Sequence, residues 1–181
     1  MSRLLNGLLV GVLAAPALAV AQTPAKASRG PSATPIIDEL KGKGLLLPVA
    51  GADPAAIRDS FRQPRGTGRV HHAVDIPAPR GTPVLAADSG EIIKLHQTSA
   101  GGLMIYTVDS SRRFIYYYAH LDRYHTNVRE RRRVARGDTI GYVGTTGNAP
   151  IDHPHLHFAI LRSYDVSKWS RGVPVNPAKV F

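Results

Sequence analysis

The chain has 181 residues, of which 43% are hydrophobic and 20% charged, enough for one domain with a hydrophobic core. Its 17 Gly and 14 Pro favour short strands and turns over long helices. The absence of Cys excludes disulfides, thiolate metal ligands, a cysteine nucleophile and a lipid anchor on cysteine, while a net charge of +10 favours an anionic partner without identifying it.

The N-terminal residues 1–21 have the layout of a secretory signal peptide. Arg3 precedes an apolar run over residues 7–20, and small residues at Ala19 and Ala21 suit a cleavage site. The run is shorter than the roughly 20 apolar residues that a membrane span needs. We therefore expect cleavage after residue 21 and an exported protein, periplasmic or extracellular and associated with the cell wall, with no membrane span after processing. An uncleaved anchor or a buried helix is the alternative.

Residues 22–44 are predicted to form a linker followed by one short helix. Residues 22–34 are rich in small residues, Pro and Lys, a composition that favours a flexible linker. The helix is predicted over residues 35–43, where Ile36 and Leu40 have the spacing of one helical face.

Residues 45–181 are predicted to form one domain rich in β-strands. Short apolar or alternating runs are separated by turns that contain Gly, Pro, Asp or Ser. The strands are expected at residues 45–49, 69–77, 82–86, 91–96, 103–108, 113–121, 139–143 and 155–161. In the second of these strands, Val70, Val74 and Ile76 are expected to face the core. The predicted fold class is mainly β: a compact antiparallel domain with one short N-terminal helix.

Three short segments hold most of the residues suited to metal binding or acid–base chemistry. They are residues 71–75, 118–121 and 155–158, each on a predicted strand. Imidazole and carboxylate are ligands that zinc takes when no thiolate is available. Each segment alone could be structural, but the three together predict a metal site.

Strand periodicity predicts which side chains of these segments share a face. Alternate residues of a strand point to the same side of the sheet. The expected same-face pairs are His71 with Asp75, Tyr118 with His120, and His155 with His157. His72 is expected to point away from this face.

Other functional motifs are absent from the sequence. It contains no His-Glu-x-x-His, no Gly-x-Ser-x-Gly and no Gly-x-x-x-x-Gly-Lys. The basic run at residues 129–136 has no interleaved aromatic residues on which bases could stack. We therefore expect no nucleic-acid partner; the run is a solvated face or a contact for an anionic wall polymer.

From about residue 47 to the end, the chain resembles the lysostaphin and LytM-type zinc endopeptidases of bacterial cell walls. The resemblance rests on residues 68–76, 80–84, 118–121, 137–144, 146–147 and 155–158. It implies a two-sheet antiparallel β domain with a groove over one sheet. The domain boundaries expected on this basis are 1–21 for the signal peptide, 22–44 for the linker and helix, and 45–181 for the metallopeptidase domain.

The resemblance also implies roles for individual residues. The implied ligands of one zinc ion are His71, Asp75 and His157, and the implied catalytic residues are His120 and His155. Tyr118 is expected to donate a hydrogen bond near the substrate, with packing as the open alternative. The implied activity is hydrolysis of peptide cross-links in peptidoglycan, by a protein for which a monomer is favoured. The alternative is a non-catalytic LytM-type regulator that binds the wall or activates an amidase.

Two features depart from the family pattern. Ala73 stands where the family usually has Gly, and its methyl group would be unfavourable at a positive φ. The loop at residues 148–154 is longer than usual and is expected to shape one wall of the groove. His153 is expected to be exposed in this loop, with a contact to substrate as the alternative.

Overall fold

The computed structural model describes residues 33–66 and 68–181, so the predicted signal peptide and residues 22–32 of the linker lie outside the described part. Its elements are α1 (Ala33–Lys43), η1 (Pro54–Ala56), β1 (Pro64–Arg65), β2 (Arg69–Val70), β3 (Val74–Pro77), β4 (Pro83–Leu85), β5 (Gly90–Thr98), β6 (Gly102–Asp109), β7 (Phe114–Tyr124), β8 (Arg133–Val134), β9 (Thr139–Val143), β10 (His155–Arg162), η2 (Val166–Lys168), β11 (Val173–Val175) and η3 (Pro177–Lys179). No helix within these two ranges is both long enough and apolar enough to cross a membrane.

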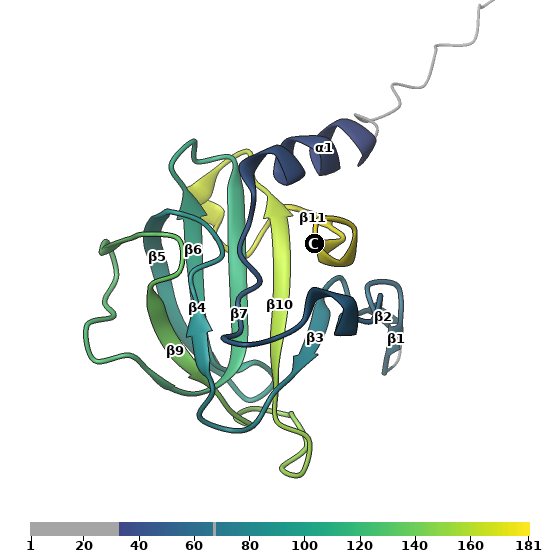
Figure 1. The fold of residues 1–181 in the computed structure, drawn as a ribbon, viewed down its shortest axis with the longest axis vertical. Helices are drawn as coiled ribbons and strands as arrows, with labels where there is room; N and C mark the ends of the chain where they lie inside the picture. The colour runs from purple at the N-terminus through teal and green to yellow at the C-terminus, as the bar shows by residue number, and fades with distance from the viewer. Residues whose placement is uncertain (1–32, 67) are drawn as a thin grey trace, which may run out of the picture. The chain divides into compact units, whose positions relative to one another are not determined.

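The domain is built around a nine-stranded antiparallel sheet (Figure 1). Its main path runs β11-β10-β7-β6-β5-β8. Strand β10 pairs with β3 near its start and with β11 near its end, and β7 pairs with β9 beyond Leu121. Strands β1 and β2 form a separate two-stranded sheet. These observations confirm the prediction of a mainly β antiparallel domain with a short N-terminal helix.

The two faces of the large sheet carry different hydrophobic clusters. The main core takes Tyr116, Tyr118, Leu156, Phe158 and Ile160 from β7 and β10, all fully buried. A smaller cluster on other positions of the sheet contains Met104, Tyr106, Val108, Ile115 and Ala119. Because the core residues of β10 alternate with its histidines, the histidines face away from the main core.

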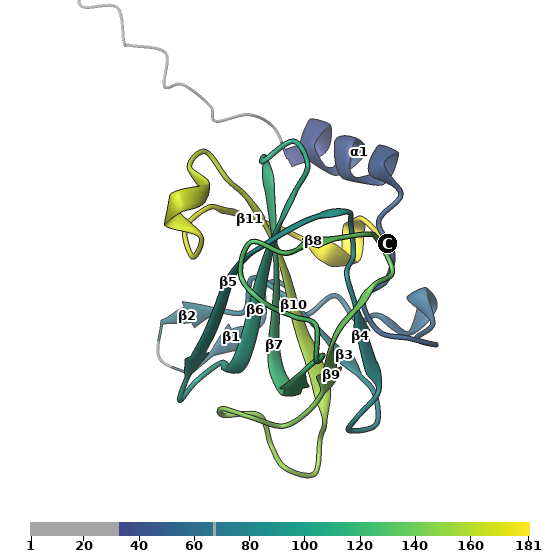
Figure 2. The same cartoon turned by 90° about the vertical axis from the view of Figure 1, so that its left-hand side faces the viewer.

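Helix α1 lies at one end of the sheet (Figures 1 and 2). Leu40 of this helix is fully buried in the main core. The Lys43 ammonium lies 3.0 Å from Asp88 and 2.9 Å from Asp109, whose side chain is fully buried. Apolar burial and these ion pairs therefore hold the predicted helix on the sheet.

Residues 45–49 do not form the predicted strand, although they run beside β4. They make one isolated bridge, between Val49 and Val84, and the Leu46 N–H donates to the Ala87 carbonyl at 2.9 Å. Pro48 has no N–H to donate and interrupts a regular ladder. The prediction was right about burial at Val49, which is 2% exposed, and wrong about the strand.

The predicted strand at residues 69–77 is two strands separated by a break. His72 has a φ of 54°, a left-handed conformation that ends the alternation. The N–H groups of His71 and His72 donate to the carbonyls of Gln63 and Phe61 instead. Val70, predicted to face the core, is 45% exposed because it lies before this break.

Candidate functional site

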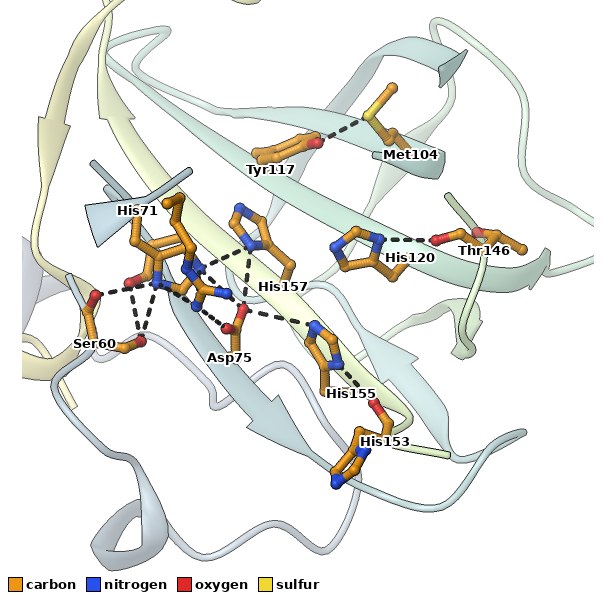
Figure 3. A network of polar contacts seen from close by, with 12 residues as sticks. Ser60, His71, Asp75, Met104, Tyr117, His120, Thr146, His153, His155 and His157 are labelled. Carbon is orange, nitrogen blue, oxygen red and sulfur yellow. Dashed lines mark hydrogen bonds and ion pairs between the residues drawn. The ribbon is translucent and has the colours of Figure 1, made fainter. Parts of the chain in front are cut away.

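Three side chains converge on the face of the sheet opposite the main core (Figure 3). His71 precedes β3, Asp75 belongs to β3, and His157 lies directly opposite Asp75 in the pairing of β3 with β10. The Nε2 atom of His71 is 3.0 Å from both Asp75 Oδ1 and His157 Nδ1. One ligand atom from each residue lies within 4.8 Å of the other two, so the group forms a candidate metal site.

The chemistry of this group fits a zinc ion. Two imidazoles and one carboxylate are a common ligand set that leaves a position open for water or substrate. The Nδ1 atom of His71 is 3.1 Å from the Ser60 carbonyl oxygen, so its N–H donates there and the lone pair of Nε2 faces the site. Burial raises the pKa of Asp75, but its close contacts with the rings of His157 and His71 outweigh burial and hold the pKa well below its usual range. Asp75 is therefore ionised, as a metal ligand would need to be.

Two further histidines lie beside the candidate metal site. The ring centroid of His120 is 5.1 Å from that of His155 and 5.7 Å from that of His157. His120 Nδ1 lies 2.9 Å from the Thr146 carbonyl oxygen, and His155 Nδ1 lies 2.8 Å from the His153 carbonyl oxygen. Each Nδ1–H donates to its carbonyl, so in the neutral ring Nε2 carries the lone pair.

The position of His120 depends on an irregularity in β7. His120 has a φ of 61°, and the pairing of β7 with β6 shifts register between Tyr118 and Leu121. The pairing of β7 with β9 shifts register between Leu121 and Arg123. Burial lowers the pKa of His120 to about 4, against the opposing hydrogen bond to Thr146. His120 is therefore a neutral imidazole near pH 7.

The same irregularity overturns the expectation for Tyr118. Tyr118 is fully buried against Phe158, and its hydroxyl accepts a hydrogen bond from the Ala87 N–H at 3.0 Å. It lines no part of the cavity at the site, so packing accounts for it. Tyr117 lines the cavity instead, with its ring centroid 5.6 Å from that of His157. Strand alternation from Ala119, which pairs with His157, would have found Tyr117.

A loop after β9 supports His120 through its backbone. The Thr146 hydroxyl donates to the Leu121 carbonyl at 2.7 Å and accepts from the Leu103 N–H at 2.9 Å. Gly147 has a φ of +77°, and a Cβ there would lie 2.3 Å from the Gly102 nitrogen. This close approach accounts for the Thr-Gly pair in the sequence.

The four histidines and Asp75 described above line a cavity of about 410 Å³. Besides the five site residues and Tyr117, its lining includes Arg65, Arg69, Val70, Ala100, Gly101, Asn148, Ala149 and Pro150. Residues 148–150 therefore form part of the wall, as expected for this loop. His153 is exposed, with 77% of its side chain accessible. Arg65 was not predicted as a site residue, because its place at the cavity depends on the fold of the β1–β2 sheet.

His72 and Ala73 lie between the candidate metal ligands His71 and Asp75. His72 is exposed, and its ring centroid lies 5.5 Å from that of Phe61. The side chain therefore points away from the candidate metal site, as expected. Ala73 is fully buried and is not among the non-glycine residues with positive φ in the described part. The unusual backbone conformation falls on His72, and Ala73 is accommodated without it.

Residues 69–177 match the family model of Peptidase family M23. The chain is 36% identical over 117 residues to the cell division protein DipM of Caulobacter vibrioides, covering 64% of this chain and 18% of that protein. It is 36% identical over 96 residues to the peptidoglycan DD-endopeptidase ShyC of Vibrio cholerae, covering 53% of this chain and 21% of that protein.

Among solved structures, the catalytic domain of lysostaphin from Staphylococcus simulans aligns with a TM-score of 0.53 and 27% identity, covering 78% of this chain and 93% of that domain. A peptidase M23 protein from Pseudomonas aeruginosa aligns with a TM-score of 0.56 and 26% identity, covering 76% of this chain and 51% of that one. The chain spans only a minor part of the length of the two curated relatives above. Since the family model covers more than half of the chain and includes the candidate metal site, the protein belongs to peptidase family M23.

Proposed function

We propose that this protein is a zinc-dependent endopeptidase that hydrolyses peptide cross-links in bacterial peptidoglycan. The observation that carries the proposal is the convergence of His71, Asp75 and His157 beside His120 and His155 in one open cavity. The names of curated relatives support the substrate class: they include a peptidoglycan DD-endopeptidase, an L-Ala–D-Glu endopeptidase and a glycyl-glycine endopeptidase. These names describe different bonds, so the proposal extends to the class of bond and not to one linkage.

In this proposal, His71, Asp75 and His157 hold one zinc ion per chain. When bound, zinc supplies a Lewis acid that polarises the scissile carbonyl and lowers the pKa of a water molecule from about 15.7 to about 7. Ser60 fixes the ring of His71 through its carbonyl, so that His71 Nε2 stays directed at the site.

His120 and His155 are the residues that accept and donate protons during hydrolysis. Both are oriented by a hydrogen bond from Nδ1–H to a backbone carbonyl, which leaves Nε2 to accept a proton from the attacking water. Once protonated at Nε2, either ring can donate to the developing oxyanion or to the leaving amine. The carbonyls of Thr146 and His153 then stabilise the imidazolium. The pair supplies both functions, and either ring can serve as the base.

We extend the proposal to location and organisation. Membership of a family of peptidoglycan hydrolases implies a place in the cell envelope, consistent with a signal peptide over residues 1–21. The metallopeptidase domain then spans residues 45–181 and acts as a monomer. The non-catalytic regulator is the weaker candidate because all five site residues are present and brought together.

Digestion of purified peptidoglycan tests the proposed function. The zinc-loaded protein without residues 1–21 is incubated with walls that contain direct or glycine-bridged cross-links, and the released fragments are weighed by mass spectrometry. We expect loss of cross-linked fragments, abolished by a chelator and restored by added zinc. His120→Ala should retain zinc and lose cleavage. An absence of cleavage across all these walls would contradict the proposal, and stimulation of an amidase by His120→Ala would favour the regulator.

A further inference from the structure

The two-stranded sheet of β1 and β2 places two arginines at the cavity. Arg65 and Arg69 are opposite each other in this sheet, and both line the cavity. Among the described residues of the lining, Asp75 is the one carboxylate, and it is already committed to the candidate metal site. With a divalent ion bound there, the cavity would carry an excess of positive charge, which favours an anionic substrate.

Arg65 already holds a carboxylate at this site. Its Nη2 atom lies 2.5 Å from Asp75 Oδ2 and 3.2 Å from His71 Nε2. The other Asp75 oxygen, Oδ1, faces His71 and His157. The guanidinium therefore reaches the metal ligands themselves and forms a charge-assisted hydrogen bond with a carboxylate there.

A divalent cation on the three ligands changes this contact. The ion and the guanidinium are like charges beside the same carboxylate, so they repel each other. Both also need the lone pair of His71 Nε2, from which Arg65 Nη2 lies 3.2 Å. The Arg65 side chain is 43% accessible, which leaves it room to turn toward the open part of the cavity. A planar guanidinium fork is suited to a carboxylate of the substrate in place of Asp75.

We infer that Arg65, assisted by Arg69, binds a carboxylate of the peptide substrate and selects cross-links that carry a free carboxylate beside the scissile bond over those with a carboxamide. The inference rests on the proposed function, since it concerns the substrate of the same site. In the zinc-loaded protein, the substrate carboxylate replaces Asp75 as the partner of Arg65, while Asp75 remains a zinc ligand. Arg65 is thus a specificity-determining residue that touches substrate.

A matched pair of synthetic cross-linked peptides tests this inference. The peptides are identical except for a free carboxylate or a carboxamide on the residue next to the scissile bond. We expect the zinc-loaded wild type to cleave the free acid with a kcat/KM about tenfold or more above that of the amide, mainly through KM, as one charge-assisted hydrogen bond predicts. Arg65→Ala should lose this preference by losing activity on the free acid alone.

Two controls separate this role from a purely structural one. Arg62→Ala removes an exposed positive charge nearby that does not line the cavity, and it should keep the preference. Zinc content is measured for every variant and should be unchanged. Equal cleavage of both peptides by the wild type would overturn the inference. An equal loss on both peptides in Arg65→Ala would also overturn it, because Arg65 would then only orient Asp75.

Failure of the proposed function can be distinguished from failure of the inference about Arg65. If neither peptide is cleaved, endopeptidase activity on this substrate is refuted, and titration calorimetry of the same peptides against the zinc-loaded protein still decides the inference. Tighter binding of the free acid that disappears in Arg65→Ala supports it. Equal binding of the two peptides overturns it.

Discussion

The Nδ1–H of His120 donates to the backbone carbonyl of Thr146 across 2.9 Å. A neutral imidazole has one N–H, so this bond places the proton on Nδ1 and the lone pair on Nε2. The carbonyl is itself held in place, because the Thr146 hydroxyl bonds to Leu121 and Leu103. Thr146 is thus a positioning residue for His120.

Replacing Thr146 should disturb the orientation of His120 and leave substrate binding nearly unchanged. Thr146→Val keeps the shape of the side chain and loses both hydroxyl bonds, which frees the loop that carries the carbonyl. We expect kcat to fall about tenfold or more with a small change in KM, because displacement of a catalytic group chiefly affects the transition state. Thr146→Ser retains the hydroxyl and should stay near the wild-type kcat. Steady-state kinetics with zinc content measured in parallel checks this; a change confined to KM would count against it.

Substitutions of the adjacent β7 residues Tyr117 and Tyr118 should have different effects on stability and on KM. Tyr118→Phe removes the acceptor of the Ala87 N–H inside the core, so it should lower the free energy of unfolding by about 1 kcal/mol and leave KM unchanged. Tyr117→Ala removes part of the cavity wall and should raise KM. Urea unfolding and kinetics on both variants provide the test. A raised KM in Tyr118→Phe would show that the assignment of these two faces is wrong.

The stability of the domain should depend on pH through Asp109. This buried carboxylate accepts hydrogen bonds from the Arg113 and Phe114 N–H groups and pairs with Lys43. Burial raises its pKa, but the Ser111 hydroxyl, these N–H groups and Lys43 together lower it below the ordinary value. A carboxyl with a lowered folded-state pKa stabilises the protein above its unfolded-state pKa, and this contribution is lost as the pH falls through the folded-state pKa.

Asp109→Asn measures that contribution. We expect it to lower the free energy of unfolding by about 2 kcal/mol at pH 7, with the difference from wild type narrowing as the pH falls below about 4. Asp38→Asn, an exposed position on α1, is the control and should change stability by less than about 0.5 kcal/mol. Urea unfolding followed by circular dichroism across this pH range gives the values. A difference that does not change with pH would show that the charge of Asp109 is not what stabilises the helix.

Regular strands made part of the site predictable from sequence. In β10 the alternation of period two holds without interruption, so Leu156 and Phe158 enter the core and His155 and His157 face the cavity. The strand at residues 139–143 and a helix at residues 35–43, observed as Ala33–Lys43, were also predicted from local patterns. In these segments, local patterning and tertiary packing agree.

The predictions failed where the backbone leaves the regular pattern. His72 and His120 both have positive φ, and each breaks the alternation that had been used to assign Val70 and Tyr118. Non-glycine residues rarely adopt this conformation, so the sequence contains no signal for it. Backbone partners such as the carbonyls of Ser60 and Thr146 are equally hidden, because every residue type supplies one.

The proposed function divides the site into zinc ligands, which include His157, and catalytic histidines, which include His120. Elemental analysis of zinc in the dialysed wild type, His157→Ala and His120→Ala tests it most directly. We expect about one zinc per chain in the wild type, almost none in His157→Ala, and about one in His120→Ala together with loss of peptidoglycan cleavage. Full zinc content in His157→Ala, or loss of zinc in His120→Ala with an intact fold by circular dichroism, would contradict it.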